Sequence, residues 1–149
     1  MSTFKILLVI LLAVTAFAAH SDEYLGKLSE NPYNADSTSN AYGQYGSEYS
    51  GKSINNSYGR YGSEYSNESA RNPYATNAPK LYDSDGNYRG KLSNNRYDPD
   101  SVSNPYGRYG SEYSSDSINS PYGAGSPYRS DSPTNPYGEG MSIYGDEGG

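Results

Sequence analysis

Cysteine and tryptophan are absent from this chain of 149 residues, and histidine occurs once. The absence of cysteine excludes disulfide bonds, thiolate metal sites, cysteine nucleophiles and a lipidated N-terminal cysteine. The single histidine, His20, lies beside an expected cleavage site, so it is a poor candidate for the base that a serine nucleophile needs. We therefore predict a protein that is not an enzyme and that uses no cofactor.

Large aliphatic side chains are scarce as well. Beyond residue 21 they are scattered singly, without helical or strand spacing, at Leu25, Leu28, Ile54, Leu81, Leu92, Val102, Ile118, Met141 and Ile143. Burying a leucine or isoleucine stabilises a fold by roughly 1.5–3 kcal/mol, whereas fixing the backbone of each residue costs about 1–2 kcal/mol. Aliphatic residues alone therefore cannot order the chain. Either tyrosine supplies the rest of the core or the chain is largely disordered.

Runs of lysine or arginine are also missing, and the formal net charge is −6 at pH 7 with acidic and basic residues interspersed. Nucleic acids and anionic membranes are bound through a basic surface. We therefore expect no nucleic-acid partner and no membrane partner once the N-terminal leader has been removed.

The N-terminus has the pattern of a secretory signal peptide. Lys5 supplies the positive charge, an apolar run follows, and Ala16-Phe17-Ala18 has the small-x-small pattern of a cleavage site. Cleavage after Ala18 is our first choice, with an alternative end at residue 21. An uncleaved anchor is disfavoured because the apolar run is shorter than the ~20 residues of a spanning helix. The sequence thus predicts an exported protein, periplasmic or extracellular.

Tyrosine is abundant, with 19 residues, and it follows a sixteen-residue repeat. Residues 24–87 divide into four blocks, and residues 88–149 repeat the same four-block order with some shortening. The best preserved block is NPYGRYGSEYSSDSIN, residues 104–119. The repeat places one set of rings at Tyr42, Tyr58, Tyr74, Tyr106, Tyr122 and Tyr137, and a second set at Tyr33, Tyr49, Tyr65, Tyr97 and Tyr113.

The glycine, proline, asparagine and serine content of each block argues against helix beyond the signal peptide and favours turns, for which Asn-Pro-Tyr-Gly is a good sequence. One hairpin is indicated, with strands at about 79–83 and 87–92 around an Asp-Gly loop, and residues 24–28 copy its second arm. The predicted fold is a turn-rich repeat protein with little regular secondary structure, a loose β/turn solenoid. The alternative is a largely disordered chain.

The hairpin loop contains a weak calcium candidate formed by Asp83, Asp85 and Asn87. An EF-hand loop would need a bidentate glutamate at its twelfth position, where this chain has Asn94. An ordinary hairpin loop is the better interpretation, and we predict no metal site. Separately, Asn55 and Asn67 each begin an N-glycosylation sequon, which matters only in a host that glycosylates exported chains.

The tyrosine sets carry the functional hypotheses. Together with the Asn-Pro-Tyr-Gly and Tyr-Gly-Ser-x-Tyr-Ser motifs and the central segment 81–88, they resemble a group of small exported bacterial proteins of unassigned function, a resemblance that implies no activity. The rings could merely replace an aliphatic core. We favour a structural or self-associating protein of the cell envelope or extracellular space, with a glycan-binding or envelope-polymer-binding module as the alternative. The candidate binding residues are Tyr42, Tyr49, Tyr58, Tyr65, Tyr106, Tyr113 and Tyr122.

Overall fold

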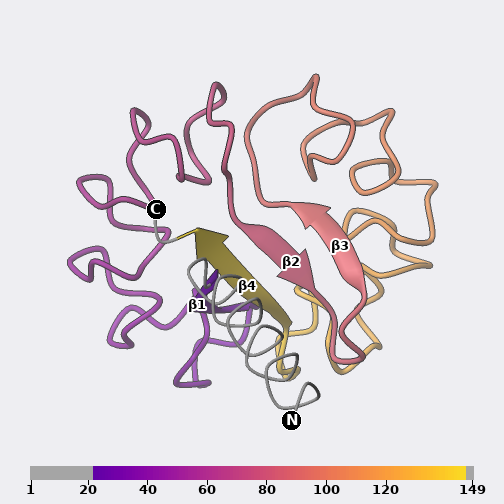
Figure 1. Cartoon of the computed structure of the whole chain (residues 1–149). Coiled ribbons are helices and arrows are strands. Elements are labelled where there is room, and N and C mark those ends of the chain that lie inside the picture. The colour runs from indigo at the N-terminus through magenta and orange to yellow at the C-terminus, as the bar shows by residue number, and fades with distance from the viewer. Residues whose placement is uncertain (1–21, 147–149) are drawn as a thin grey trace, which may run out of the picture.

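The computed structural model describes residues 22–146, which form one small antiparallel sheet surrounded by turns (Figure 1). The expected signal peptide lies outside these residues. Four strands in the spatial order β1-β4-β2-β3 make the sheet: β1 (Asp22–Leu28), β2 (Lys80–Tyr82), β3 (Tyr88–Lys91) and β4 (Met141–Asp146). No helix occurs between residues 22 and 146. The expected turn-rich chain with little regular structure is thus confirmed for this part.

The predicted hairpin is present, with β2 antiparallel to β3 and Tyr82 opposite Tyr88. Gly86 provides the positive φ of +82° that the loop needs. The predicted strand at 24–28 is also present, as β1, but it does not pair with its sequence copy β3. The two lie at opposite edges of the sheet, and β1 pairs with β4, a strand that the sequence did not predict.

Outside the sheet the chain advances mainly in three-residue steps. In each step a backbone N–H donates to the carbonyl oxygen three residues earlier, as from Ser53 to Ser50 and from Asn56 to Ser53. The side chain that opens a step usually accepts a second hydrogen bond from the N–H two residues later, the serine and asparagine turn chemistry expected from composition. One four-residue step, from Gly43 to Ser47, followed by four three-residue steps accounts for the sixteen-residue repeat.

Glycine is required where successive steps pack together. A Cβ added to Gly46 or to its counterpart Gly110 would overlap the backbone carbonyl oxygen of Asn40 or Asn104. The second glycine of the Tyr-Gly-x-Tyr-Gly-Ser motif is therefore explained by close backbone approach.

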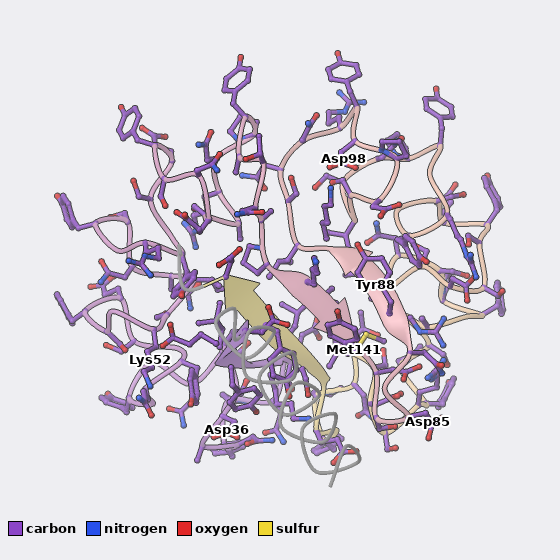
Figure 2. All side chains as sticks on the ribbon, in the orientation of Figure 1. Asp36, Lys52, Asp85, Tyr88, Asp98 and Met141 are labelled. Carbon is purple, nitrogen blue, oxygen red and sulfur yellow. The ribbon has the colours of Figure 1, made fainter. Side chains whose placement is uncertain are left out.

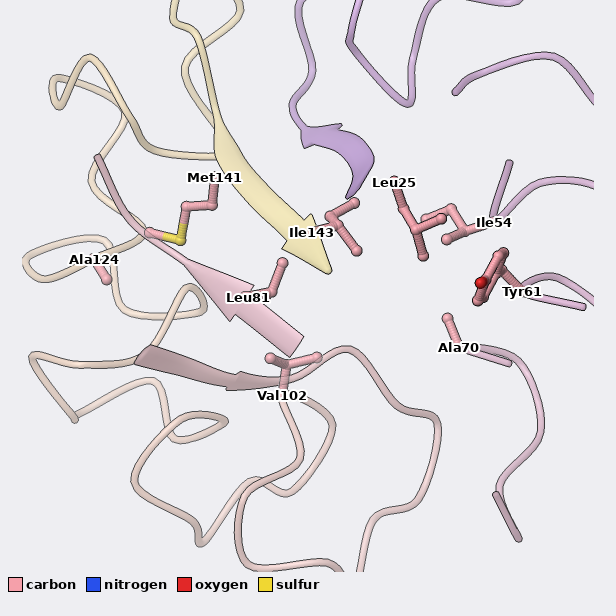
Figure 3. Close-up of a cluster of buried hydrophobic side chains, with 9 residues drawn as sticks. All are labelled: Leu25, Ile54, Tyr61, Ala70, Leu81, Val102, Ala124, Met141 and Ile143. Atoms are coloured by element: carbon pink, nitrogen blue, oxygen red, sulfur yellow. The ribbon is translucent and has the colours of Figure 1, made fainter. Parts of the chain in front are cut away.

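The hydrophobic core is small and packs against one face of the sheet. Leu81 and Ile143, opposite each other on β2 and β4, are fully buried at its centre. The other members of this buried cluster gather on either side of them (Figure 3): Leu25, Ile54, Tyr61, Ala70, Val102, Ala124 and Met141.

A column of buried serines supplements this core. One serine in each of six blocks is less than 2% exposed: Ser37, Ser53, Ser69, Ser101, Ser117 and Ser132. Their hydroxyls are bonded to the backbone, as Ser37 and Ser101 donate to the carbonyls of Ser29 and Ser93. Within the described part of the chain, every buried side-chain nitrogen and oxygen has a hydrogen-bond partner. Small, satisfied polar side chains thus fill space that aliphatic groups occupy in most domains.

Candidate functional site: the tyrosine surface

The tyrosines fall into two groups with different environments. Seven are at least partly buried at or near the sheet, whereas twelve stand at the tips of turns and are 86–99% exposed. We call these twelve the outer tyrosines: Tyr33, Tyr42, Tyr49, Tyr58, Tyr65, Tyr74, Tyr97, Tyr106, Tyr113, Tyr122, Tyr128 and Tyr137. Phenol rings project from the periphery of the molecule in Figure 2.

The turn chemistry explains why these rings point outward. In most turns that carry an outer tyrosine, the tyrosine N–H donates to the side chain of the residue two positions earlier. Asn40 and Ser47, for example, hold the N–H groups of Tyr42 and Tyr49 at 3.1 Å. Because this bond directs the turn-opening side chain inward, the tyrosine at the tip of the turn is left facing the solvent.

All seven candidate binding residues belong to the outer group. The structure brings four of them together around three adjoining grooves: Tyr42, Tyr49, Tyr58 and Tyr65. The other three, Tyr106, Tyr113 and Tyr122, lie in the second copy of the repeat and are 88–96% exposed. No ring–ring contact within residues 22–146 involves any of the seven. They are presented singly, as separate contact points.

The largest groove has a volume of about 670 Å³ and lies between Tyr58 and Tyr65. Its lining includes a carboxylate, a guanidinium and an amide, from Glu64, Arg71 and Asn94. A second groove, of about 430 Å³, is shared by Tyr49 and Tyr58, and a third, of about 620 Å³, by Tyr42 and Tyr49. We refer to the three together as the tyrosine grooves. They are open to solvent, and polar side chains line each of them between the rings.

Asn55 lines two of these grooves and is held in place by the fold. Its amide nitrogen donates to the backbone oxygens of Thr38 and Gly46 at 2.8 and 3.0 Å, and its Oδ1 accepts from Arg71 at 3.2 Å. These bonds tie neighbouring blocks together. Both hydrogens of the Asn55 amide are used by the fold, so a glycan on this sequon would remove at least one of these two bonds.

Three of the outer rings have a glutamate immediately before them. A hydrogen bond from the phenol to the carboxylate of Glu48 raises the pKa of Tyr49, and Glu64 acts in the same way on Tyr65. The same arrangement with Glu112 raises the pKa of Tyr113. These phenols therefore remain neutral hydrogen-bond donors over a wider pH range than a free tyrosine.

The sequence did not single out the second group of tyrosines. Six of them form a continuous row across the open face of the sheet, with neighbouring ring centroids 5.2–5.8 Å apart. This inner tyrosine row runs in the order Tyr45, Tyr24, Tyr144, Tyr82, Tyr88 and Tyr109, and Figure 2 shows Tyr88 above β3. The available signal was position: four of the six lie in strands.

Carboxylates anchor the second ring from each end of the inner row. The Tyr24 hydroxyl donates to Asp36 at 2.9 Å, and Tyr88 donates to Asp100 at 3.3 Å. Burial, together with these carboxylates, raises the pKa of both phenols well above the ordinary range. The rings meet edge-on or tilted rather than in parallel, which is a packing arrangement and not a flat platform.

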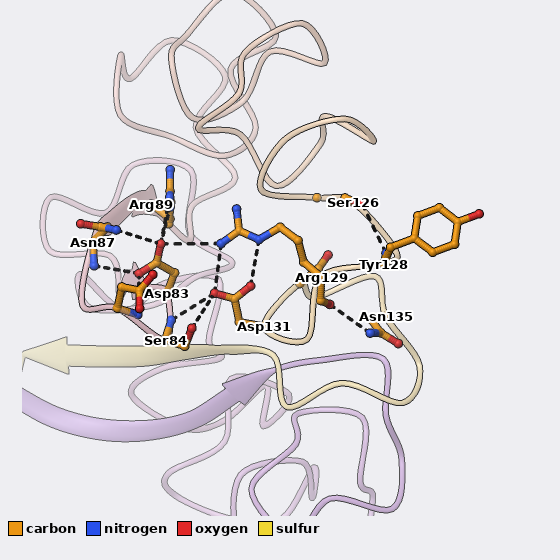
Figure 4. A network of polar contacts seen from close by, with 12 residues as sticks. Asp83, Ser84, Asn87, Arg89, Ser126, Tyr128, Arg129, Asp131 and Asn135 are labelled. Carbon is orange, nitrogen blue, oxygen red and sulfur yellow. Dashed lines mark hydrogen bonds and ion pairs between the residues drawn. The ribbon is translucent and has the colours of Figure 1, made fainter.

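Asp83, the first of the calcium candidate residues, is bound by hydrogen-bond donors of the protein itself (Figure 4). One Asp83 oxygen accepts from the backbone N–H groups of Asp85 and Asn87, and the other accepts from the guanidinium of Arg89 at 2.8–3.0 Å. Burial acts to raise the pKa of Asp83, but these donors outweigh it and the pKa lies below its ordinary value. Asp83 thus caps the hairpin loop and binds arginine. Residues 22–146 contain no cluster of three or more metal-ligating side chains.

Arg89 continues the network to Asp116 at 2.6 Å, and Arg129 links Asp83 to Asp131. The Asp131 carboxylate also accepts from the backbone and hydroxyl of Ser84. Each carboxylate of the network is therefore paired with an arginine, and the network stabilises the loop.

Comparison with known proteins gives no further assignment, because no family model, curated protein or solved structure matches the chain. Between residues 22 and 146 the structure has no helix with the length and apolar character of a membrane span.

Proposed function

We propose that this chain is an exported, non-enzymatic protein that associates with further copies of itself through the outer tyrosines. The observation that carries the proposal is that twelve phenol rings stand 86–99% exposed on a hydrogen-bonded turn scaffold. In this view the turn blocks act as a short, loose solenoid that spaces the rings. The place of action is the periplasm, the cell envelope or the extracellular space.

The outer rings are available for association because the fold does not use them. The core and the inner row account for the other seven tyrosines, so the interpretation of tyrosine as a replacement for aliphatic residues applies to that group only. Twelve solvent-exposed rings contribute no burial within the monomer. Tyrosine is enriched where one chain meets another, because its ring offers apolar area and its hydroxyl a hydrogen bond.

The strength of such association depends on how many rings are buried at once. Burying one aromatic side chain yields about 1.5–3 kcal/mol, and bringing two proteins together costs an estimated 4–15 kcal/mol. One or two isolated rings therefore cannot hold a complex, whereas four or more engaged together can. We expect weak, multivalent association that increases steeply with concentration.

The test uses residues 19–149 over a concentration series in sedimentation velocity. A triple variant, Tyr106→Ser, Tyr113→Ser and Tyr122→Ser, removes three outer rings at positions that are 88–96% exposed. We expect association to weaken while the melting temperature and far-UV spectrum stay the same. The matched control is Lys52→Ser, a change at another exposed turn residue. Association that is unaltered when all twelve outer tyrosines are replaced by serine would refute the proposal.

A second function, binding of a glycan or another envelope polymer, is favoured by one observation. The tyrosine grooves place rings beside a carboxylate, a guanidinium and amides, groups that can stack on a sugar ring and bond to its hydroxyls. A polysaccharide pull-down tests it. Saturable binding that is lost in Tyr58→Ala and Tyr65→Ala, and retained in Tyr106→Ala and Tyr113→Ala, would support this function. Absence of saturable binding on a glycan array would exclude it for the glycans displayed.

A further inference from the structure

Every strand pairing in the sheet joins the first part of the chain to the second. The first half, residues 22–82, contributes β1 and β2, and the second half, residues 88–146, contributes β3 and β4. The three pairings are β1 with β4, β4 with β2, and β2 with β3, so within each half the two strands are not neighbours. The sheet is therefore an interface between the two halves.

The hydrophobic core also lies between the two halves. Leu81 of the first half faces Ile143 of the second across the centre of the sheet, and buried residues from both halves surround them (Figure 3). The first half supplies Leu25, Ile54, Tyr61 and Ala70, and the second supplies Val102, Ala124 and Met141. Neither half contains a complete core without the other.

The two halves use equivalent contacts. Tyr24 meets the ring of Tyr45 at 5.2 Å, and Tyr88 meets that of Tyr109 at the same distance, 64 residues later. The phenol-to-carboxylate bonds of Tyr24 and Tyr88 are likewise 64 residues apart. So are the parallel bridges that flank the two edge strands, at Lys27–Ser37 and Lys91–Ser101.

With Leu81 opposite Ile143 at the centre, the halves are related by an approximate twofold arrangement. The strand pairings that each half offers to the other are thus equivalent, as in the contact of a symmetric dimer, although individual core residues differ.

Only the loop 83–87 connects the two halves. Gly86 has a φ of +82°, and no heavy atom lies within 4 Å of the position that its Cβ would occupy. Ser84, Asp85 and Gly86 are exposed. A loop this short holds the second half at a millimolar effective concentration beside the first, which favours the closed monomer in dilute solution. The same loop is the point at which the two halves could separate without breaking any packing within either half.

We infer that the surface between the halves is a self-recognition surface, and that a second copy of this chain is its partner. In the exchanged dimer the first half of each chain pairs with the second half of the other, and the loop 83–87 serves as the hinge. The sheet of each lobe retains the order β1-β4-β2-β3, with β4 and β3 drawn from the other chain. This surface is distinct from the outer tyrosines.

The test is to delete Ser84–Asn87, which leaves Asp83 alone between the paired residues Tyr82 and Tyr88. Regular hairpin loops need at least two residues, so β2 can no longer turn back onto β3 within one chain. We expect the mass measured by light scattering to double, from monomer to dimer, while the far-UV spectrum is preserved. The matched control inserts Gly-Ser-Gly-Ser between Asp85 and Gly86. This variant should remain monomeric, because the entropic cost of closing a loop rises only slowly with its length.

A cysteine pair reports which chains are paired, since the natural sequence has no cysteine. Lys80 and Lys91 are opposite each other on β2 and β3, so Lys80→Cys with Lys91→Cys should form a disulfide within one chain when the loop is intact. In the deletion variant the same pair should link two chains, seen as a dimer on a non-reducing gel. Adding Tyr106→Ser, Tyr113→Ser and Tyr122→Ser should leave this dimer intact, which separates it from association through the outer rings.

Two outcomes would overturn the inference. In one, the deletion variant is a monomer with the native spectrum, which would mean that the hinge does not control pairing. In the other, it is unfolded at every concentration, which would mean that the halves do not recognise each other between chains. Equal dimerisation of the deletion and insertion variants would also overturn it, because the dimer would then be independent of loop length.

Discussion

Replacing Arg89 by leucine tests whether the second half of the molecule is stabilised by charge where the first half is stabilised by apolar packing. Residue 25 occupies the equivalent position in the first repeat and is a fully buried leucine. Arg89 instead binds the Asp83 carboxylate through Nε and Nη2 at 3.0 and 2.8 Å, with the Asp83 side chain fully buried and that of Arg89 12% exposed. A leucine at this repeat position is therefore accommodated in the first half. In the second half, the same residue would remove the partner of a buried carboxylate.

The expected effect is large. Removing one partner of a buried ion pair leaves the other uncompensated and costs about 3–5 kcal/mol. The remaining donors to Asp83, including the more distant Arg129 at 3.8 Å, compensate in part. The leucine regains little by packing, because the second repeat has no counterpart of Tyr61, against which Leu25 lies in the first. We expect urea denaturation of Arg89→Leu at pH 7 to show a loss of about 3 kcal/mol.

The pH dependence distinguishes charge from shape. The pKa of Asp83 is lowered in the folded state, so its contribution to stability is present above the unfolded value near 3.8 and is lost as the pH falls through the folded value. The difference in unfolding free energy between wild type and Arg89→Leu should therefore shrink below about pH 4. Arg89→Lys, which keeps the charge without the two-pronged geometry, should lie between them. An equal difference at pH 7 and pH 3 would refute the electrostatic explanation.

Two further predictions concern local packing. Gly110→Ala should destabilise the fold by about 1–3 kcal/mol in urea denaturation, because its Cβ would overlap the Asn104 carbonyl. The control is Gly51→Ala, where no heavy atom lies within 4 Å of the added Cβ, and it should be neutral or stabilise the fold by about 0.4–1 kcal/mol. Equal effects of the two substitutions would contradict the packing argument. Tyr61→Phe removes a hydroxyl that donates to Glu23 at 2.7 Å, so the thermal midpoint should fall by the equivalent of about 1.5–3 kcal/mol, and an unchanged midpoint would show that water replaces this bond.

Local features of the fold could be predicted from the sequence, whereas the long-range pairing could not. The hairpin of β2 and β3 was predictable because both arms and their Asp-Gly loop lie within a few residues of each other. β4 has an alternating pattern in which Met141 and Ile143 are buried, but it lies between two glycine-rich segments and exists as a strand because β1 and β2 flank it. That stabilisation comes from residues 60 or more positions away, which no local pattern indicates.

The candidate site was predictable in part for the same reason. The sixteen-residue repeat identified sets of equivalent tyrosines, and equivalence in sequence gave equivalence in exposure, as Tyr42, Tyr58 and Tyr106 show. It could not show that these sets are exposed whereas Tyr45 and Tyr109, at another position in the same blocks, pack at the sheet. The buried serines also carried no signal, because serine is usually exposed and becomes satisfied here only through turns formed by the folded backbone.

The buried serines have a thermodynamic consequence. Exposure of apolar surface raises the heat capacity on unfolding and exposure of polar surface lowers it, for a net of about 12–15 cal/mol/K per residue in ordinary domains. Here six of the side chains that are less than 2% exposed are serines, and the outer tyrosines, 86–99% exposed in the native state, are hydrated before unfolding begins. The heat-capacity change should therefore fall well below that range. A small value flattens the stability curve, so the free energy of unfolding of this protein should change little between cold and warm conditions.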